Sequence, residues 1–319
     1  ANVTNASEHE RFVDSVLVEV AAYAELSGRL AEAGLRAPRP LHVPPARRGE
    51  PATLVLEDLS EAFPRGAGGK LRQMTRDEIR SAAQWLAGFH ALFWEAPRAA
   101  ERGLWSRGTY WHLDQWGREE LESVPKTFSN RYISNEDWLR LRNAADAIDA
   151  RLAGLLATTR EAPDGPFGGG ARFRTLLHGD AKPANILCSA AWGTPDVECA
   201  LLDFSWVGEG YGMYDVMYLL WGEFTQDDVD RALQEYHSAL IGHLPHGIAD
   251  YTMEVLRGHF DLCVLDFMRW WAGFREGEHF WALPWALDIF HDVMDRLDGG
   301  ELLTPAEYAE AIEREFPFP

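Results

Sequence analysis

The chain has 319 residues, 46% of them hydrophobic, and a formal net charge of −20 at pH 7. This length and composition suffice for a sizeable core in one or two domains. The charge argues against a nucleic-acid partner, because such binding depends on basic side chains that neutralise phosphates, and it favours a cationic small molecule instead.

The sequence also predicts where the protein resides. No apolar run is long enough to cross a bilayer, and no signal-peptide pattern follows Ala1, so we expect no membrane partner. The three cysteines, Cys188, Cys199 and Cys263, are odd in number and lack paired metal spacing. This usage predicts a reduced, cytoplasmic setting.

Helix signals and short β-like runs alternate along the chain before a helical final third. Thr75 with Glu78 forms a capping box, and Thr225 and Thr304 mark later helix starts. Helices are predicted over residues 8–33, 135–156, 248–275 and 284–297. Three further helices are predicted to begin at residues 75, 225 and 304. The β-like runs are predicted over 53–59, 174–177, 186–188 and 200–202, with a long loop over 162–170.

The most informative stretch covers residues 177–187, which read Leu-His-Gly-Asp-Ala-Lys-Pro-Ala-Asn-Ile-Leu. Asp180 lies in a short loop after a β-like run, and Asn185 follows five residues on. Asp203 ends a third run, so a hairpin would bring it back beside Asn185. Phosphoryl transfer needs a carboxylate that orients the accepting hydroxyl and oxygen ligands that hold Mg²⁺. The spacing therefore predicts a phosphotransferase site.

These residues resemble the aminoglycoside phosphotransferase and choline kinase superfamily, whose catalytic loop reads His-Gly-Asp-x-x-x-x-Asn and whose metal-binding Asp follows a strand. Residues 203–216, Asp-Phe-Ser-Trp-Val-Gly-Glu-Gly-Tyr-Gly-Met-Tyr-Asp-Val, resemble most its ecdysteroid-kinase-like branch. Ser205 departs from that branch, which has Gln there.

The resemblance implies an α+β, protein-kinase-like fold of two lobes with a largely helical C-lobe. Residues 1–59 would form the remaining part of the N-lobe and the hinge. Residues 60–319 would form the C-lobe, with the catalytic loop and a helical acceptor-binding subdomain.

The resemblance also assigns roles, with ATP as co-substrate and Mg²⁺ as cofactor. It implies that Asp180 is the catalytic base and that Asn185 and Asp203 are the magnesium ligands. His178 and Asp215 would brace the loop.

Nucleotide-binding residues follow from the same resemblance. Glu57, Asp58 and Leu59 would form a hinge that hydrogen-bonds adenine through backbone groups. Glu19 resembles the glutamate that pairs with a phosphate-gripping lysine. Lys182 is a further candidate for a phosphate contact, although a loop lysine is more often a solvated charge.

The phosphate-covering loop and the lysine expected in the N-lobe are not visible. The sequence contains only Lys70, Lys126 and Lys182, and the lysine that pairs with Glu19 is expected close to or before Ala1. The N-lobe is therefore predicted to be incomplete. Three explanations compete: a shortened chain, residues missing from the sequence, or a protein that dispenses with the lysine.

Candidate acceptor-binding residues come from the helical third. Asp266 and Arg269 are expected near each other on a helix surface, beside Trp270. Trp111 belongs to a second concentration of aromatic residues. Aromatic rings with carboxylates can bind an organic cation.

The sequence thus predicts an ATP- and Mg²⁺-dependent phosphotransferase acting on a hydroxyl of an aminoglycoside-, choline- or ecdysteroid-like acceptor. The alternative is a pseudokinase or binding module that retains the fold without efficient transfer. A protein kinase is less favoured, because the loop reads His-Gly-Asp and no Ala-Pro-Glu segment follows Asp203.

Overall fold

The computed structural model describes residues 6–45, 47–50, 53–66, 73–95, 98–123, 132–154, 172–244, 250–274 and 282–317. The chain divides into two compact units, which we describe separately. Unit 1 comprises Ala1–Thr109, Arg174–Trp221 and Asp228–Ile248, and unit 2 comprises Tyr110–Phe173, Gly222–Asp227 and Ala249–Pro319. The predicted lobe boundary after residue 59 lies inside unit 1 and stays a prediction.

Unit 1 contains every strand of the described ranges and three complete helices. The helices are α1 (Ala6–Glu32), α2 (Arg76–Leu92) and α5 (Met213–Leu219), and most of α6 (Gln226–His243) also belongs to this unit. The strands are β1 (Pro40–His42), β2 (Val55–Leu56), β3 (Arg65–Gly66), β4 (Arg174–Leu177), β5 (Ile186–Cys188), β6 (Cys199–Leu201) and β7 (Gly208–Tyr211).

The strands form three small antiparallel sheets, β1–β2, β3–β5–β6 and β4–β7. In the β5–β6 hairpin Ile186 pairs with Leu201, so Asn185 directly precedes one strand and Asp203 lies two residues beyond the other. The hairpin predicted between these two residues is confirmed. The β-rich run predicted over 53–59 contributes only the two residues of β2 to a strand.

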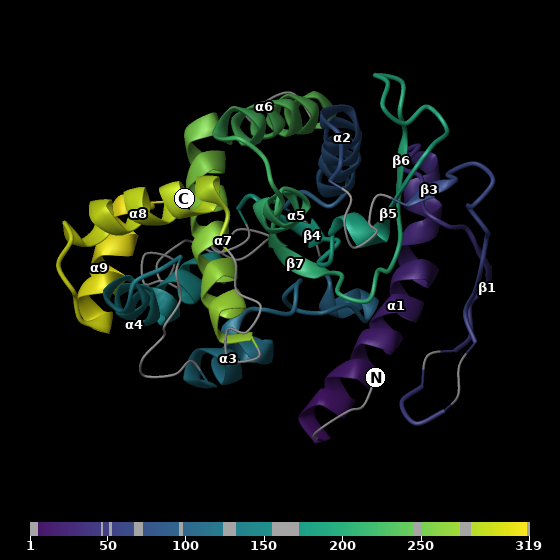
Figure 1. Cartoon of the computed structure of the whole chain (residues 1–319). Helices are drawn as coiled ribbons and strands as arrows, with labels where there is room; N and C mark the ends of the chain where they lie inside the picture. Colours follow the sequence, from purple (N-terminus) through teal and green to yellow (C-terminus); the bar gives the residue numbers. More distant parts are fainter. Residues whose placement is uncertain are drawn as a thin grey trace. The chain divides into compact units, whose positions relative to one another are not determined.

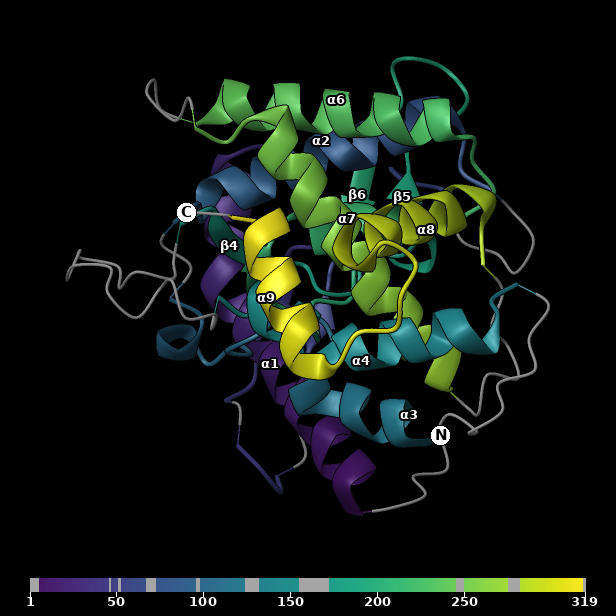
Figure 2. The ribbon, with the colours of Figure 1, turned by 90° about the vertical axis from the view of Figure 1, so that its left-hand side faces the viewer.

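Helix α2 forms the centre of unit 1. Thr75 and Glu78 make the predicted capping box at its start, and its buried face packs against α5, β4 and β6. Its last turn carries His90, whose Nδ1 lies 2.7 Å from the hydroxyl of Tyr236 on α6. Figure 2 shows α2 and α6 side by side.

The regular elements in the described part of unit 2 are all helical. Its elements are the π-helical turn η2 (Leu113–Gly117) and the helices α3 (Arg118–Ser123), α4 (Asn135–Leu152), α7 (Met253–Gly273), α8 (Pro284–Asp298) and α9 (Pro305–Glu315). Helix α4 lies against both α7 and α9 (Figure 1). Helix α7 is buried over most of its length, and its buried residues include the charged Asp261, Asp266 and Arg269 among many apolar ones. Among the helices described here, none is long and apolar enough to cross a membrane.

Most helix predictions agree with the structure within a few residues. The helix start predicted at Thr304 is confirmed, and the structure adds a capping box between Thr304 and Glu307. The helix expected from Ile248 begins later, at Met253, because the Thr252 side chain accepts the backbone N–H of Val255 and caps it there. The loop expected over 162–170 and the end of the helix expected at Leu156 lie outside the described residues.

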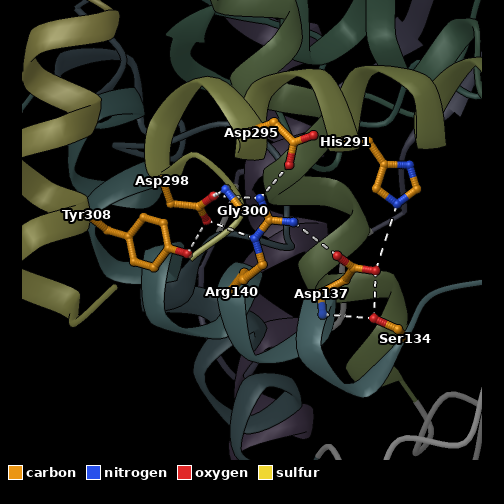
Figure 3. Close-up of polar contacts among 8 residues, drawn as sticks. All are labelled: Ser134, Asp137, Arg140, His291, Asp295, Asp298, Gly300 and Tyr308. Carbon is orange, nitrogen blue, oxygen red and sulfur yellow. Dashed lines mark hydrogen bonds and ion pairs between the residues drawn. The ribbon is translucent and has the colours of Figure 1, made fainter. Parts of the chain in front are cut away.

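A cluster of ion pairs around Arg140 joins α4 to α8 (Figure 3). The guanidinium donates from Nε and Nη2 to the two carboxylate oxygens of Asp298, at 2.8 and 2.6 Å. It also donates to Asp295 at 2.7 Å and to Asp137 at 3.1 Å. Tyr308 of α9 donates its hydroxyl to Asp298 at 2.5 Å, so the cluster spans three helices. Burial raises the pKa of Asp298, but hydrogen bonds from Arg140 and Tyr308 outweigh it and lower the pKa.

We predict that Arg140→Ala lowers the free energy of unfolding by about 3 kcal/mol, because the fully buried carboxylate of Asp298 loses its ion-pair partner. Urea unfolding measures the change. The matched control is Arg118→Ala, whose ion pair with Asp146 is exposed and contributes at most about 1 kcal/mol. Equal losses in the two variants would contradict the prediction.

Candidate active site

The catalytic loop follows β4 and depends on one glycine. Gly179 has φ = +83°, and a Cβ atom there would lie 2.0 Å from the carbonyl oxygen of Trp206. Only glycine fits both the conformation and the space. The loop and the segment after Asp203 are therefore in direct contact.

Asp215, in the first turn of α5, holds the start of this loop. One carboxylate oxygen accepts the backbone N–H of His178 at 2.6 Å, and the other accepts that of Gly179 at 2.9 Å. His90 on α2 lies 3.1 Å from the same carboxylate. These contacts suit the bracing role predicted for Asp215.

His178 joins the loop to the strand that leads to Asp203. Its Nδ1 accepts the backbone N–H of Asp180 at 3.3 Å, and its Nε2 lies 3.0 Å from the carbonyl oxygen of Leu202. This pattern requires a neutral ring that is protonated on Nε2. Complete burial lowers the pKa of His178 and keeps the ring neutral.

Asp180 is 2% exposed, and its two carboxylate oxygens differ. Oδ2 accepts from Lys182 Nζ at 2.7 Å and from Asn185 Nδ2 at 2.8 Å. Oδ1 is buried and has no hydrogen-bond partner in the described part of the chain. Burial raises the pKa of Asp180 to about 6, helped by the Asp203 carboxylate and opposed by Lys182 and Asn185. A carboxylate with one free oxygen and a pKa near neutrality suits a general base.

Asn185 and Asp203 lie together at the end of the β5–β6 hairpin. The backbone N–H of Leu202 donates to the carbonyl of Asn185 at 2.9 Å, which fixes the register. Asp203 has a left-handed backbone, with φ = +64°, and accepts the hydroxyl of Ser205 on Oδ1 at 2.5 Å. Phe204 anchors the turn, because its buried ring packs against those of Tyr23, Trp85 and His178.

The donor atoms at this position fit Mg²⁺. The Nδ2 of Asn185 donates to Asp180, which leaves its Oδ1 for a cation beside the carboxylate of Asp203. Both are hard oxygen ligands of the kind that Mg²⁺ prefers. No cluster of three or more His, Cys, Asp and Glu in the described ranges could hold a metal. A Mg²⁺ ion here would therefore share its coordination with phosphate and water.

A cleft of about 820 Å³ opens beside Asp203 within unit 1. One wall comes from α1, including Glu19 and Tyr23, and another from residues 56–60. Leu187 and Leu202 also line it. This size and mixture of apolar and polar groups are typical of a small-molecule site.

The predicted nucleotide-binding residues Glu19, Glu57, Asp58 and Leu59 all line this cleft. The Glu57 carboxylate is bound elsewhere, to Arg36 at 2.7 Å and to the backbone N–H of Arg39 at 3.1 Å. Asp58 accepts the backbone N–H of Ser60 at 2.9 Å. These side chains stabilise the segment, so a bound base would contact its backbone.

Two features of the site were not predicted from the sequence. Lys182 was interpreted as more often a solvated charge, yet it forms an ion pair with Asp180 two residues earlier. Ser205 was noted only as a departure from a family pattern, yet its hydroxyl contacts the Asp203 carboxylate. The short spacings were a signal for both contacts, but spacing alone does not give side-chain direction.

Asp266 and Arg269 lie next to each other on α7, as their spacing predicts. Both are fully buried in α7, where Arg269 donates to Asp266 at 2.8 Å and to the carbonyl oxygen of Trp111 at 2.7 Å. Trp111 and Trp270 are also buried, with ring centroids 6.3 Å apart. The pair is buried because large aromatic rings surround this side of α7. Acceptor binding by these four residues stays a prediction.

Comparison with known proteins assigns the family. Residues 10–251 match the model of the phosphotransferase enzyme family (APH), and the chain belongs to that family. The predicted superfamily and the α+β kinase-like fold class with a helical C-terminal part are thereby confirmed. The ecdysteroid-kinase-like branch stays a prediction.

Comparison with curated proteins finds no match. Among solved structures, the chain is similar to a microcompartment-associated aminopropanol kinase, with 17% identity, coverage of 94% of this chain and 82% of that chain, and a TM-score of 0.49. It is also similar to an aminoglycoside-3'-phosphotransferase of type VIII, with 19% identity, coverage of 76% and 79%, and a TM-score of 0.38.

The cleft also predicts a pH-dependent stability. Burial, and then the carboxylate of Asp203, raise the pKa of Glu19 from 4.5 to about 7. A raised folded-state pKa contributes stability that is complete below pH 4.5 and is lost as the pH rises through 7. Above pH 7, Glu19→Gln should therefore unfold with a free energy about 1 kcal/mol higher than wild type, after discounting for partial solvent screening.

Urea unfolding at pH 5 and pH 8 measures this difference. Glu25→Gln is the matched control, because Glu25 lies on the same helix but is exposed. The stability of Glu19→Gln relative to wild type should be greater at pH 8 than at pH 5. If it is the same at both pH values, Glu19 is not buried beside the Asp203 carboxylate as described.

Proposed function

We propose that this chain is an ATP- and Mg²⁺-dependent phosphotransferase that transfers the γ-phosphoryl group to a hydroxyl of a small molecule. The observation that carries the proposal is the Oδ1 of Asp180, which has no hydrogen-bond partner among the described residues and belongs to a buried carboxylate with a pKa of about 6. Membership of the phosphotransferase enzyme family supports it.

Each residue of the site has a role in this mechanism. Asp203 and Asn185 would hold Mg²⁺ through oxygen atoms, and the bound ion would supply neutralisation of phosphate charge. Residues 56–60 and α1 enclose the cleft in which the nucleotide would bind. Asp180 Oδ1 would accept a hydrogen bond from the acceptor hydroxyl and orient it for in-line attack.

Asp180 takes up the proton that the transfer step releases. As the acceptor oxygen bonds to the γ-phosphorus, the bond from that phosphorus to the bridging oxygen breaks and ADP leaves. The hydroxyl proton passes to the Asp180 carboxylate. Lys182, which is ion-paired with the other oxygen of that carboxylate, keeps Asp180 ionised before the step.

The acceptor class follows from charge. With a net charge of −20, the protein attracts cations, so we propose a cationic alcohol such as an amino alcohol or an aminoglycoside-like acceptor. A search would begin with these compounds and include choline- and ecdysteroid-like alcohols.

The alternative function is a binding module that retains the fold without efficient transfer. It is favoured by the carboxyl group of Glu19, which is close enough to that of Asp203 for their charges to interact. An active kinase places a lysine beside this glutamate. Nucleotide binding without turnover on any acceptor would support the alternative.

Replacement of the two aspartates separates binding from chemistry. We predict that Asp203→Ala removes Mg²⁺-dependent ATP binding, because the hard anionic ligand is lost. Asp180→Asn should leave that binding intact and lower kcat by about 10²- to 10⁴-fold, because the proton acceptor is lost. Calorimetric titration measures the first effect and acceptor-dependent ADP release the second.

Asp196→Ala is the control, because Asp196 is exposed in the connection between β5 and β6. It should match wild type in both assays. Full turnover in Asp180→Asn, or unchanged Mg²⁺-dependent binding in Asp203→Ala, would refute the assigned roles.

The pH dependence of turnover tests the role of Lys182. The rate should fall as the pH falls through about 6, because Asp180 must be ionised to accept the proton. Lys182 lowers the pKa of Asp180, so Lys182→Ala should move this acidic limb to higher pH. The kcat–pH profile measures the shift, and Lys182→Arg should keep the wild-type position. An unmoved limb in Lys182→Ala would show that another group governs it.

A further inference from the structure

Residues 105–109, which we call the strap, lie along the segment that follows Asp203. Trp105 N–H donates to the carbonyl of Val207 at 3.0 Å, and Gly108 N–H donates to that of Glu209 at 2.9 Å. Both segments belong to unit 1. The strap therefore adds a backbone partner to the chain between Asp203 and β7.

The two backbones approach so closely that a side chain would not fit between them. A Cβ atom at Gly208 would lie 2.6 Å from the nitrogen of Gly108 and 2.6 Å from the carbonyl oxygen of Trp105. Gly208 is thus required by the strap. This contact explains why one of the glycines in residues 208–212, Gly208, is needed. The spacing of the glycines in this segment does not fit a phosphate-binding loop.

Trp105 connects the strap to the candidate metal ligand. Its indole N–H donates to the carbonyl oxygen of Ser205 at 2.9 Å, and its ring stacks on Trp206 with centroids 5.4 Å apart. The hydroxyl of Ser205 in turn donates to Asp203 Oδ1 at 2.5 Å. A continuous set of contacts thus runs from the strap to the Asp203 carboxylate.

The last residue of the strap is held in an unfavourable conformation. Thr109 is fully buried and has φ = +73°, a genuine outlier for a β-branched residue. Its N–H donates at 3.3 Å to the carbonyl oxygen of Trp206, the same atom that approaches Gly179 of the catalytic loop. Strain of this kind persists only where surrounding contacts enforce it, and it is concentrated at functional sites.

We propose that the strap positions Asp203 for its divalent cation, with Trp105 and Ser205 as positioning residues that set cation affinity. The inference rests on the proposed function, because it assigns Mg²⁺ with ATP to this site. Neither residue has a part in the proton transfer. Outer contacts that orient a metal ligand commonly change metal affinity by about 10- to 100-fold.

The test is calorimetric titration of Mg²⁺ into the full chain with ATP present, for wild type and Trp105→Phe. Phenylalanine keeps an aromatic ring over Trp206 but loses the N–H that donates to Ser205. We expect the apparent affinity for Mg²⁺ to fall by about 10-fold, with a smaller change in kcat at saturating Mg²⁺. Trp192→Phe is the matched control, because Trp192 is 49% exposed and stacks on Arg65 instead. It should bind Mg²⁺ as wild type does.

Ser205 gives an independent test in case Trp105→Phe fails to fold. Ser205→Ala removes the hydroxyl that contacts Asp203 and should weaken Mg²⁺ binding, whereas Ser205→Thr retains a hydroxyl and should restore it at least in part. Thermal unfolding confirms that each variant is folded. A purely structural role would lower stability in these variants without changing the Mg²⁺ affinity of the folded protein.

The outcomes separate the two proposals. If wild type shows no Mg²⁺-dependent nucleotide binding, the proposed function fails, and the inference fails with it. If wild type binds but folded Trp105→Phe and Ser205→Ala bind Mg²⁺ equally well, the positioning role is overturned while the proposed function stands.

Discussion

The candidate site depends on the two hydrogen bonds that Asp215 accepts from the backbone of His178 and Gly179. A buried carboxylate needs such donors, because hydrogen bonds must offset the loss of its hydration. The same two donors fix the loop that carries Asp180. His178 then extends the constraint to the carbonyl of Leu202, one residue before Asp203. The proposed base and the proposed metal ligand are thus positioned from one anchor at the start of α5.

The electrostatics of the site are unfavourable without a ligand. Burial raises the pKa of Glu19 and of Asp180, and the charge of Asp203 raises each of them further. Lys182 offsets part of this repulsion at Asp180 only. A divalent cation at Asp203 would offset this repulsion, because its positive charge would lie beside the carboxylate that interacts with both other acids. The acidic cleft is therefore suited to the metal-bound nucleotide that we propose.

Local sequence signals predicted the features that depend on near neighbours. The capping box at Thr75, the helix start at Thr304 and the hairpin between Asn185 and Asp203 arise from residues a few positions apart or from adjacent strands. Burial could not be predicted in the same way. The i,i+3 spacing of Asp266 and Arg269 places them together, but their burial depends on a contact with Trp111, more than 150 residues away. Helix periodicity gives the faces of α7 and not what covers them.

Two strained residues mark where the fold favours geometry over stability. Asp203 and Thr109 both have positive φ, and strain of this kind costs about 1–3 kcal/mol for each residue. The segment that follows Asp203 is joined by hydrogen bonds to the strap, which ends at Thr109. Each segment therefore helps to hold the other in place. Serine at position 205 fits this arrangement, because its short hydroxyl reaches Asp203 within its own turn while the Ser205 carbonyl accepts from Trp105. Departures from local preference concentrate at functional sites, and here one is Asp203 itself and the other, Thr109, is hydrogen-bonded to the segment that follows it.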